Sequence, residues 1–154
     1  MAGPVPEEKV YAAITDLGAS GAYYIASAAD EIYADPASIV GSIGVIMAGF
    51  GFQEAADKLG VEGRVLTAGE NKAVMDPFSP ISADDREHMQ TMLDEIHQQF
   101  ITAVKNGRGD RLKADTHPEI FSGLFWTGEK ALDLGLVDGL KSPGDVARDV
   151  VNLE

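Results

Sequence analysis

One stretch near the start of the 154-residue chain narrows the fold more than any other, because it joins a strand to a helix through a turn of small residues. Residues 10–14 are apolar and of strand length, which predicts a buried strand. In residues 16–24, Asp-Leu-Gly-Ala-Ser-Gly-Ala-Tyr-Tyr, glycines and alanines flank Ser20 on both sides. The small and apolar residues 23–29 predict a helix. Ser20 is therefore expected at a strand-to-helix turn.

Ser20 has two interpretations at this turn. Its hydroxyl would be exposed beside the free amides and the positive dipole end of the new helix. An acyl-transfer enzyme needs such a nucleophile, together with donors for the oxyanion. The alternative is that Ser20 only caps the helix, and the local sequence taken alone favours this alternative. The rest of the chain has to decide between the two.

Composition excludes several classes of function. The length fits one domain with a sizeable core. The chain has no cysteine, so thiol catalysis, disulfides and thiolate metal sites are excluded. The net charge of -13 argues against nucleic acid or an anionic membrane as a partner. No apolar run approaches the roughly 20 residues of a transmembrane helix, and residues 1–9 are expected to be a tail or a junction.

Strands alternate with helices after this turn, which predicts an α/β domain. Further strands are expected at 31–34, 38–46, 64–67 and 136–137. Helices are expected at 52–59 with a stop at Gly60, at 82–106, from Gly128 to a stop at Gly135, and at 143–150. Helix 82–106 is the clearest, because Ser82 and Asp85 resemble a capping box and one apolar stripe follows at helical spacing.

A nucleophilic serine needs a base within hydrogen-bond reach. His88 and His97 lie nine residues apart on the predicted long helix and face opposite sides of it, while His117 precedes Pro118 in a loop. None has an evident carboxylate partner, and each is interpreted as a surface histidine. The serine-hydrolase elbow pattern also fails, because Ala22 stands where its last glycine belongs. These features disfavour a Ser-His-Asp triad.

Lysine is the other possible base, and it must be neutral to accept a proton. Holding a lysine half neutral at pH 7 costs about 4.6 kcal/mol from an ordinary pKa near 10.4, and burial can supply a shift of that size. Lys72 fits best, because it follows a glycine-containing loop and precedes the apolar residues 73–75. The other candidates lie among polar residues: Lys58, Lys105, Lys113 and Lys141. A solvated surface lysine is the alternative for Lys72.

Six motifs then follow one another at characteristic spacing: residues 18–24, 28–32, 41–46, 59–60, 68–72 and the ending 126–138. In this order they resemble the signal peptide peptidase A family of serine-lysine peptidases. The resemblance covers residues 10 to about 150 of the chain. It implies the Clp protease/crotonase-like fold, an α/β fold of repeated β-β-α units.

The resemblance also implies roles for particular residues. The serine of the Ala-Ser-Gly motif is the family's nucleophile and falls on Ser20, and the loop lysine of its short members is the general base and falls on Lys72. The serine that orients this lysine falls on Ser42. The backbone amide of Gly21, at the helix start, would supply one donor of the oxyanion hole. This chemistry needs no cofactor and no metal ion, and the acidic residues at 84–87 are interpreted as a favourable first helical turn.

Family members carry a further strand, a glycine-rich loop and a helix before this segment. Residues 10–154 are therefore expected to be the C-terminal part of a peptidase domain, lacking its N-terminal part and the second oxyanion donor, which could leave the isolated chain inactive. The resemblance implies peptide substrates such as cleaved signal peptides, and a homo-oligomer. It also implies a place at the bacterial inner membrane, on the periplasmic or extracytoplasmic side, with membrane contact only through segments outside this chain.

Three other functions stay open. A crotonase-type acyl-CoA enzyme shares the fold and the Gly-Leu-Val-Asp ending at 135–138, but it would not need Ser20, Ser42 and Lys72 together. A phage-type capsid maturation protease would use the same dyad on other substrates. The third alternative is a truncated, inactive domain that only oligomerises.

Overall fold

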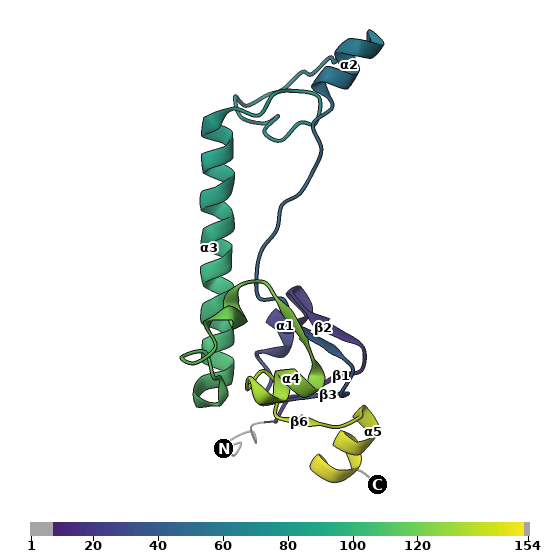
Figure 1. The fold of residues 1–154 in the computed structure, drawn as a ribbon, viewed down its shortest axis with the longest axis vertical. Helices are drawn as coiled ribbons and strands as arrows, with labels where there is room; N and C mark the ends of the chain where they lie inside the picture. Colours follow the sequence, from purple (N-terminus) through teal and green to yellow (C-terminus); the bar gives the residue numbers. More distant parts are fainter. Residues whose placement is uncertain (1–7, 153–154) are drawn as a thin grey trace, which may run out of the picture. The chain divides into compact units, whose positions relative to one another are not determined.

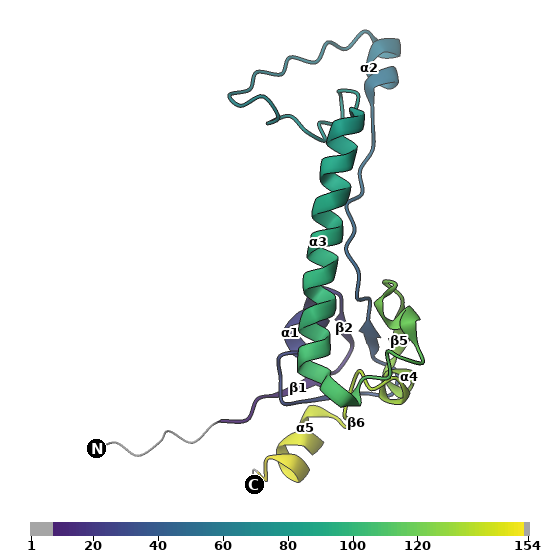
Figure 2. The ribbon, with the colours of Figure 1, turned by 90° about the vertical axis from the view of Figure 1, so that its left-hand side faces the viewer.

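A computed structural model describes residues 8–152 of the chain, drawn as a ribbon in Figure 1 and, turned by 90°, in Figure 2. The chain divides into two units, Met1–Val45 with His97–Glu154 and Ile46–Ile96. Every strand in the described residues belongs to the first unit. Residues 1–7 of the predicted tail lie outside the described residues.

The first sheet has three parallel strands in the order β1-β3-β6. β1 (Tyr11–Ile14) pairs with β3 (Glu31–Ala34), and β3 pairs with β6 (Gly139–Leu140). The strands predicted at 10–14 and 31–34 are confirmed, but the strand predicted at 136–137 is wrong. Those two apolar residues are buried without being a strand, because hydrophobicity predicts burial and leaves the type of backbone open for so short a run.

The second sheet has the order β2-β4-β5. β2 (Leu17–Ala19) runs parallel to β4 (Ile39–Gly41), and β4 is antiparallel to β5 (Phe125–Thr127). The strand predicted at 38–46 therefore ends early. Its end has a local cause, because Gly41 and Ser42 adopt positive φ angles of 102° and 53°, which lie outside the range of extended strands.

α1 (Gly21–Ala26) follows β2 and leads into β3. Tyr23 on this helix is fully buried. The ring of its neighbour Tyr24 meets the ring of Phe100 edge-on, with centroids 5.0 Å apart. Phe100 belongs to α3 (Ala83–Arg108), which is part of the first unit from His97 onward. Both ribbon views show α1 beside these last turns of α3 (Figure 1 and Figure 2).

The predicted capping box at the start of α3 is confirmed. The Asp85 amide donates to Ser82 Oγ at 3.0 Å, and the Ser82 amide donates to Asp85 Oδ2 at 3.3 Å. The helix continues to Arg108, two residues beyond the predicted 82–106. Its apolar stripe is buried at Phe100 and Val104, so the periodicity correctly indicated the face that meets the core.

The core of the first unit combines residues from both sheets and from three helices. α4 (Gly128–Asp133) follows β5 and ends before Gly135, whose φ of 77° fits the predicted stop. The remaining short elements are η1 (Gly109–Arg111), η2 (Pro118–Phe121), α5 (Pro143–Asp145) and η3 (Val146–Val150). The principal core residues are Ile14, Tyr23, Ile32, Ala34, Val40, Ile43, Phe100, Val104, Ile120, Ala131, Leu134 and Leu136.

The second unit holds α2 (Gln53–Leu59), ended as predicted by Gly60 in the left-handed conformation at a φ of 67°. The strand predicted at 64–67 is wrong, because these residues form no strand and are exposed. The ring of Phe52 lies 6.1 Å from that of Phe50 and 5.9 Å from that of Phe78.

The two sheets and the helices confirm the predicted mixed α/β class. The repeated β-β-α units of the predicted fold stay a prediction.

Candidate functional site

Ser20 lies between β2 and α1, at the predicted strand-to-helix turn. Its backbone has a φ of 54° and a ψ of -125°, and its side chain makes no capping hydrogen bond to the helix. Ser20 thus occupies the N-cap position of α1, and its carbonyl accepts from the Tyr24 amide at 2.9 Å, but its hydroxyl does not cap the helix. A non-glycine residue in such a conformation is strained, and strain of this kind gathers at functional sites. The hydroxyl of Ser20 is left available for chemistry.

Ser42 occupies the matching position after β4. The parallel register pairs Ala19 with Gly41, so Ser20 and Ser42 are the next residues at the ends of neighbouring strands. The Ser20 amide donates to the Gly41 carbonyl at 2.8 Å, and the Ser42 amide donates to the Leu124 carbonyl at 2.7 Å. Both serines have positive φ angles. The fold thus brings two strained serines to the same end of the second sheet.

Gly21 opens α1 directly after Ser20. As the first residue of a helix it has an amide with no acceptor inside that helix, and the helix dipole places partial positive charge there. A Cβ built on Gly21 would meet no atom within 4 Å. An anionic oxygen beside Ser20 would therefore find both a donor and space at this position.

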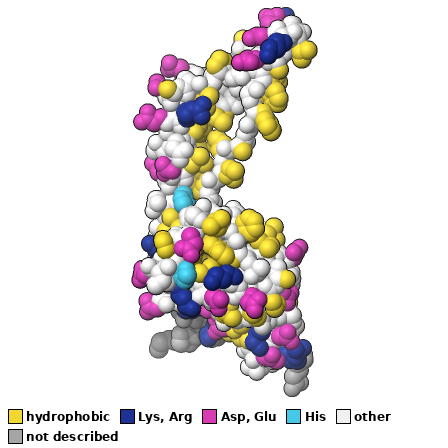
Figure 3. Space-filling model, viewed as in Figure 1, with side chains coloured by type: hydrophobic (Ala, Val, Ile, Leu, Met, Phe, Trp, Pro, Cys, Tyr) yellow, Lys and Arg dark blue, Asp and Glu magenta, His cyan; other side chains and the backbone are white. Residues whose placement is uncertain are grey.

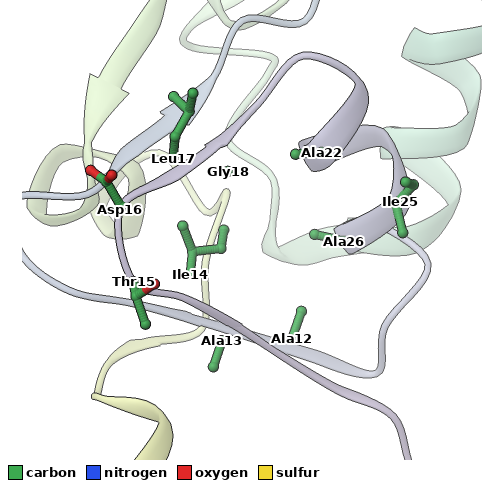
Figure 4. Close-up of a pocket in the computed structure, with 10 residues that line it drawn as sticks. All are labelled: Ala12, Ala13, Ile14, Thr15, Asp16, Leu17, Gly18, Ala22, Ile25 and Ala26. Atoms are coloured by element: carbon green, nitrogen blue, oxygen red, sulfur yellow. The ribbon is translucent and has the colours of Figure 1, made fainter.

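A hollow of about 550 Å³ lies between β1, the turn to β2, and α1. Figure 4 shows Ile14 and Leu17 on the strand side, with Ala22, Ile25 and Ala26 on the helix side. Gly18 and Ala22, which flank Ser20 by two positions on either side, both line it. Most of the side chains that line it are apolar, Thr15 and Asp16 excepted, while polar atoms also contribute to its surface.

Lys72 belongs to the second unit, whereas Ser20, Gly21 and Ser42 belong to the first. Its side chain is exposed and lies in a turn, where the Lys72 amide donates to the Gly69 carbonyl at 3.2 Å. The apolar surroundings expected for a neutral lysine are not supplied by this turn itself. The pairing of Lys72 with Ser20 therefore stays a prediction.

The histidines correct two sequence interpretations. His97 is half-buried, and its Nε2 lies 3.1 Å from the backbone oxygen of Ile43, so it is not simply a surface residue. His117 does have a carboxylate partner, Glu119, at 2.9 Å between Nδ1 and Oε1. His88 is exposed, as expected. Among the described residues none of the three is hydrogen-bonded to Ser20, which again disfavours a Ser-His-Asp triad.

A buried charge network supports the first unit and was not foreseen from the sequence. Arg108 is almost fully buried and donates to both carboxylate oxygens of Asp138, at 2.8 and 2.9 Å. Asp138 also accepts from the Ile32 amide at 2.7 Å. The Tyr23 hydroxyl donates to the Leu136 carbonyl at 2.6 Å. These bonds connect the end of α3, the start of β3, the segment just before β6, and α1.

Burial and pairing act in opposite directions on the Asp138 carboxyl. Burial raises its pKa, but the hydrogen bonds from Arg108 and Ile32 and the charges of Arg108 and Arg111 outweigh burial and hold the pKa below its ordinary value. Burial raises the pKa of the Tyr23 hydroxyl, so this side chain stays a neutral donor. Two sequence features could have indicated the network. Arg108 stands between two glycines at the end of the predicted long helix, and Asp138 ends the apolar Leu-Val-Asp segment.

No group of three or more His, Cys, Asp or Glu side chains could hold a metal ion within residues 8–152. No helix among the same residues is both long and apolar enough to cross a bilayer.

Comparison with known proteins identifies a family model that matches this chain and several similar proteins. The sequence model of peptidase family S49 matches residues 6–153. A Brucella abortus protein named Na(+)/H(+) antiporter NhaA is 54% identical over 134 residues, 87% of this chain and 18% of that protein. Capsid assembly protease C of Escherichia phage lambda is 32% identical over 148 residues, 93% of this chain and 33% of that protein. The chloroplastic serine protease SPPA of Arabidopsis thaliana is 28% identical over 148 residues, 94% of this chain and 22% of that protein. The chain thus spans 18% to 33% of the lengths of these relatives.

Proposed function

The chain belongs to peptidase family S49, the signal peptide peptidase A family, and from this premise we propose that it hydrolyses peptide bonds with Ser20 as nucleophile and Lys72 as general base. The observation that carries the proposal is the conformation of Ser20. It combines a strained backbone, a hydroxyl free of any capping bond and a position at a helix start. A nucleophile needs this exposure and the adjacent oxyanion donor.

The reaction proceeds in two steps. Neutral Lys72 takes the proton of Ser20 Oγ, which attacks the carbonyl carbon of the scissile peptide bond. The oxyanion accepts a hydrogen bond from the Gly21 amide, and the Lys72 ammonium gives its proton to the leaving amine as the C–N bond breaks. Lys72 then activates a water molecule, which attacks the acyl-enzyme ester and regenerates Ser20. Ser42 Oγ hydrogen-bonds the lysine and replaces part of its lost hydration.

The fold we assign to the chain is the Clp protease/crotonase-like fold. The order β1-β2-α1 followed by β3-β4 supports this assignment, as does the parallel pairing of the first strand of each pair and of the second. In this assignment residues 10–154 form the C-terminal part of the peptidase domain. A segment outside them supplies the second oxyanion donor.

The substrate class we propose is apolar peptides, including cleaved signal peptides at the bacterial inner membrane, on its periplasmic or extracytoplasmic side. The hollow that Gly18 and Ala22 line beside Ser20, with mostly apolar side chains around it, supports this choice. An apolar side chain that it partly covers would gain roughly 25 cal/mol for each Å² of apolar surface removed from water. The net charge of -13 would repel nucleic acid and anionic lipid headgroups.

A homo-oligomer is the assembly we propose. The second unit exposes an unusual number of large apolar side chains, and Figure 3 shows hydrophobic side chains at the surface around α2 and along the segment leading to it. Exposed apolar patches of this kind mark interaction surfaces. The side chains concerned are Ile46, Met47, Phe50, Phe52, Leu59, Val61, Val65, Leu66, Met75 and Phe78.

Capsid maturation is a second candidate function. The phage lambda relative, a capsid assembly protease, matches 93% of this chain at 32% identity. The dyad and the fold would be the same, and only the substrate would differ. Cleavage of signal peptides but not of a capsid scaffold protein would favour the first candidate, and the reverse would favour the second.

The test is labelling of the full-length protein with a fluorophosphonate, together with a peptide cleavage assay. Ser20→Ala should abolish labelling, and Lys72→Ala should slow both reactions by about a hundredfold to ten-thousandfold, the usual contribution of a general base. Lys58→Ala is the matched control, because Lys58 is an exposed lysine of the same unit that pairs with the exposed Glu54. Wild-type turnover by Lys72→Ala would refute the dyad, and labelling at another residue would refute the role of Ser20.

A further inference from the structure

His97 contacts the backbone next to Ser42. Its ring Nε2 lies 3.1 Å from the carbonyl oxygen of Ile43, and the ring is half-buried against the core. A carbonyl oxygen can only accept, so Nε2 carries a proton and donates. Ile43 is fully buried, and a buried carbonyl that loses its donor costs free energy. The bond therefore matters to the segment that contains Ile43.

The turn that holds Ser42 is tightly constrained on its other sides. The Ser42 amide donates to the Leu124 carbonyl at 2.7 Å, and the Gly44 amide donates back to the Ser42 carbonyl at 3.0 Å. A Cβ on Gly44 would lie 2.9 Å from the Cα of Gly123, so the two backbones are in close contact. Ser42 itself has a φ of 53°. A strained residue persists only where such surroundings determine its conformation.

We propose that His97 is a positioning residue that holds Ser42 in its strained conformation by donating to the Ile43 carbonyl. The proposal deepens the proposed function and rests on it, because the value of holding Ser42 lies in the hydroxyl it presents to the catalytic lysine. His97 does not act as the base. Its Nε2 proton is donated to the Ile43 carbonyl.

The test uses two substitutions at position 97 and one control. His97→Leu keeps a side chain of similar size but removes the donor. His97→Gln restores a donor, because the glutamine Nε2 is the same number of bonds from Cβ as the imidazole Nε2. The control is Gln98→Leu, which places the same leucine on the exposed side of α3 one residue away.

The first readout is amide hydrogen exchange at Gly44, which reports the turn and needs no activity. His97→Leu should speed exchange at Gly44 about tenfold, the effect of leaving one buried carbonyl without its donor. His97→Gln should restore most of the protection, and Gln98→Leu should leave it unchanged. Unchanged exchange at Gly44 in His97→Leu would overturn the proposal, whether or not the protein is a peptidase.

The second readout is the rate of fluorophosphonate labelling at Ser20, combined with Ser42→Ala. Because His97 acts through Ser42, His97→Leu should slow labelling in the wild-type background and have no further effect in the Ser42→Ala background. Effects that multiply in the double variant would show that His97 acts independently of Ser42, and would overturn the proposal. A wild-type protein that is not labelled at Ser20 would refute the proposed function, while the exchange experiment would still decide the role of His97 in the turn.

Discussion

Besides Met75 and Asn152, Ser20 and Ser42 are the non-glycine residues with a positive φ angle in residues 8–152, and these two serines lie at the ends of neighbouring strands. Each has a positive φ angle, 54° and 53° respectively, at a cost of roughly 1–3 kcal/mol per residue. Glycine would adopt these conformations without strain, so the presence of serine at both positions argues for a use of the hydroxyl. Hydrogen bonds from the Ser20 amide to the Gly41 carbonyl and from the Ser42 amide to the Leu124 carbonyl hold the two turns in place.

Asp138 is the residue whose loss should cost the most stability without touching the proposed chemistry. Asp138→Asn should lower the free energy of unfolding by about 3 kcal/mol or more, because it leaves the guanidinium of Arg108 buried without a counter-charge. Urea unfolding followed by circular dichroism measures the change. Asp149→Asn is the matched control, since its pair with Lys141 is exposed and should be worth less than about 1 kcal/mol.

The pH dependence of the same variant separates charge from packing. The pKa of Asp138 is lowered in the folded state, so its contribution is fully present above its unfolded pKa of about 4 and is lost as the pH falls through the lower folded value. The difference between wild type and Asp138→Asn should therefore shrink below about pH 4. A difference that stays constant down to pH 2 would mean that the substitution acts through shape alone.

At the scale of elements, α3 shows how local and long-range signals combine. Its start is fixed by Ser82 and Asp85, within one turn of sequence, and this part was predictable. Its last turn is fixed by a close approach: a Cβ on Gly107 would lie 1.7 Å from the backbone oxygen of Ser27, which follows α1. The sequence near Gly107 does not indicate that Ser27 packs against it.

This approach yields a prediction against helix propensity. Alanine is favoured over glycine inside a helix by about 1 kcal/mol, yet Gly107→Ala should destabilise the protein by about 2 kcal/mol or more, because the added methyl group forces α3 away from α1. The measurement is the shift in the urea midpoint. Gly63→Ala is the control, since a Cβ there meets no atom within 4 Å. Stabilisation by Gly107→Ala would show that the two helices separate at no cost.

The ends of two helices were predictable because their signals are local. The glycine stop of α2 and the capping box of α3 depend on a few adjacent residues. A strand depends instead on a partner strand, which an apolar run does not identify. Such runs therefore gave correct strands at 10–14 and 31–34 and wrong ones at 64–67 and 136–137. At the site, the turn that carries Ser20 was predictable from its small residues, whereas the strain at Ser42 and the contact of His97 depend on chain segments far apart in sequence.

At the scale of the whole molecule, the proposed catalytic groups are divided between two units. Ser20, Gly21 and Ser42 belong to the unit that contains both sheets, and Lys72 belongs to residues 46–96. Sequence reasoning selected Lys72 among the lysines by its glycine-containing loop and the apolar residues 73–75, and the resemblance to a family then implied its role as general base. In the proposed oligomer, burial of the second unit's apolar surface would supply the desolvation that this turn lacks.

Assembly can be tested at Leu66, whose side chain is 99% exposed. If the exposed apolar side chains of the second unit join copies of the chain, Leu66→Glu should shift the sedimentation coefficient toward that of a smaller species, because a buried unpaired carboxylate opposes association. Thr67→Glu is the matched control, because it adds the same negative charge one residue away, at an exposed side chain that is already polar. Both variants therefore change the net charge of -13 by the same amount. Equal sedimentation of both variants and the wild type would exclude Leu66 from any interface. Dissociation of both variants would instead indicate charge repulsion. Loss of an apolar contact at Leu66 would dissociate Leu66→Glu and leave Thr67→Glu assembled.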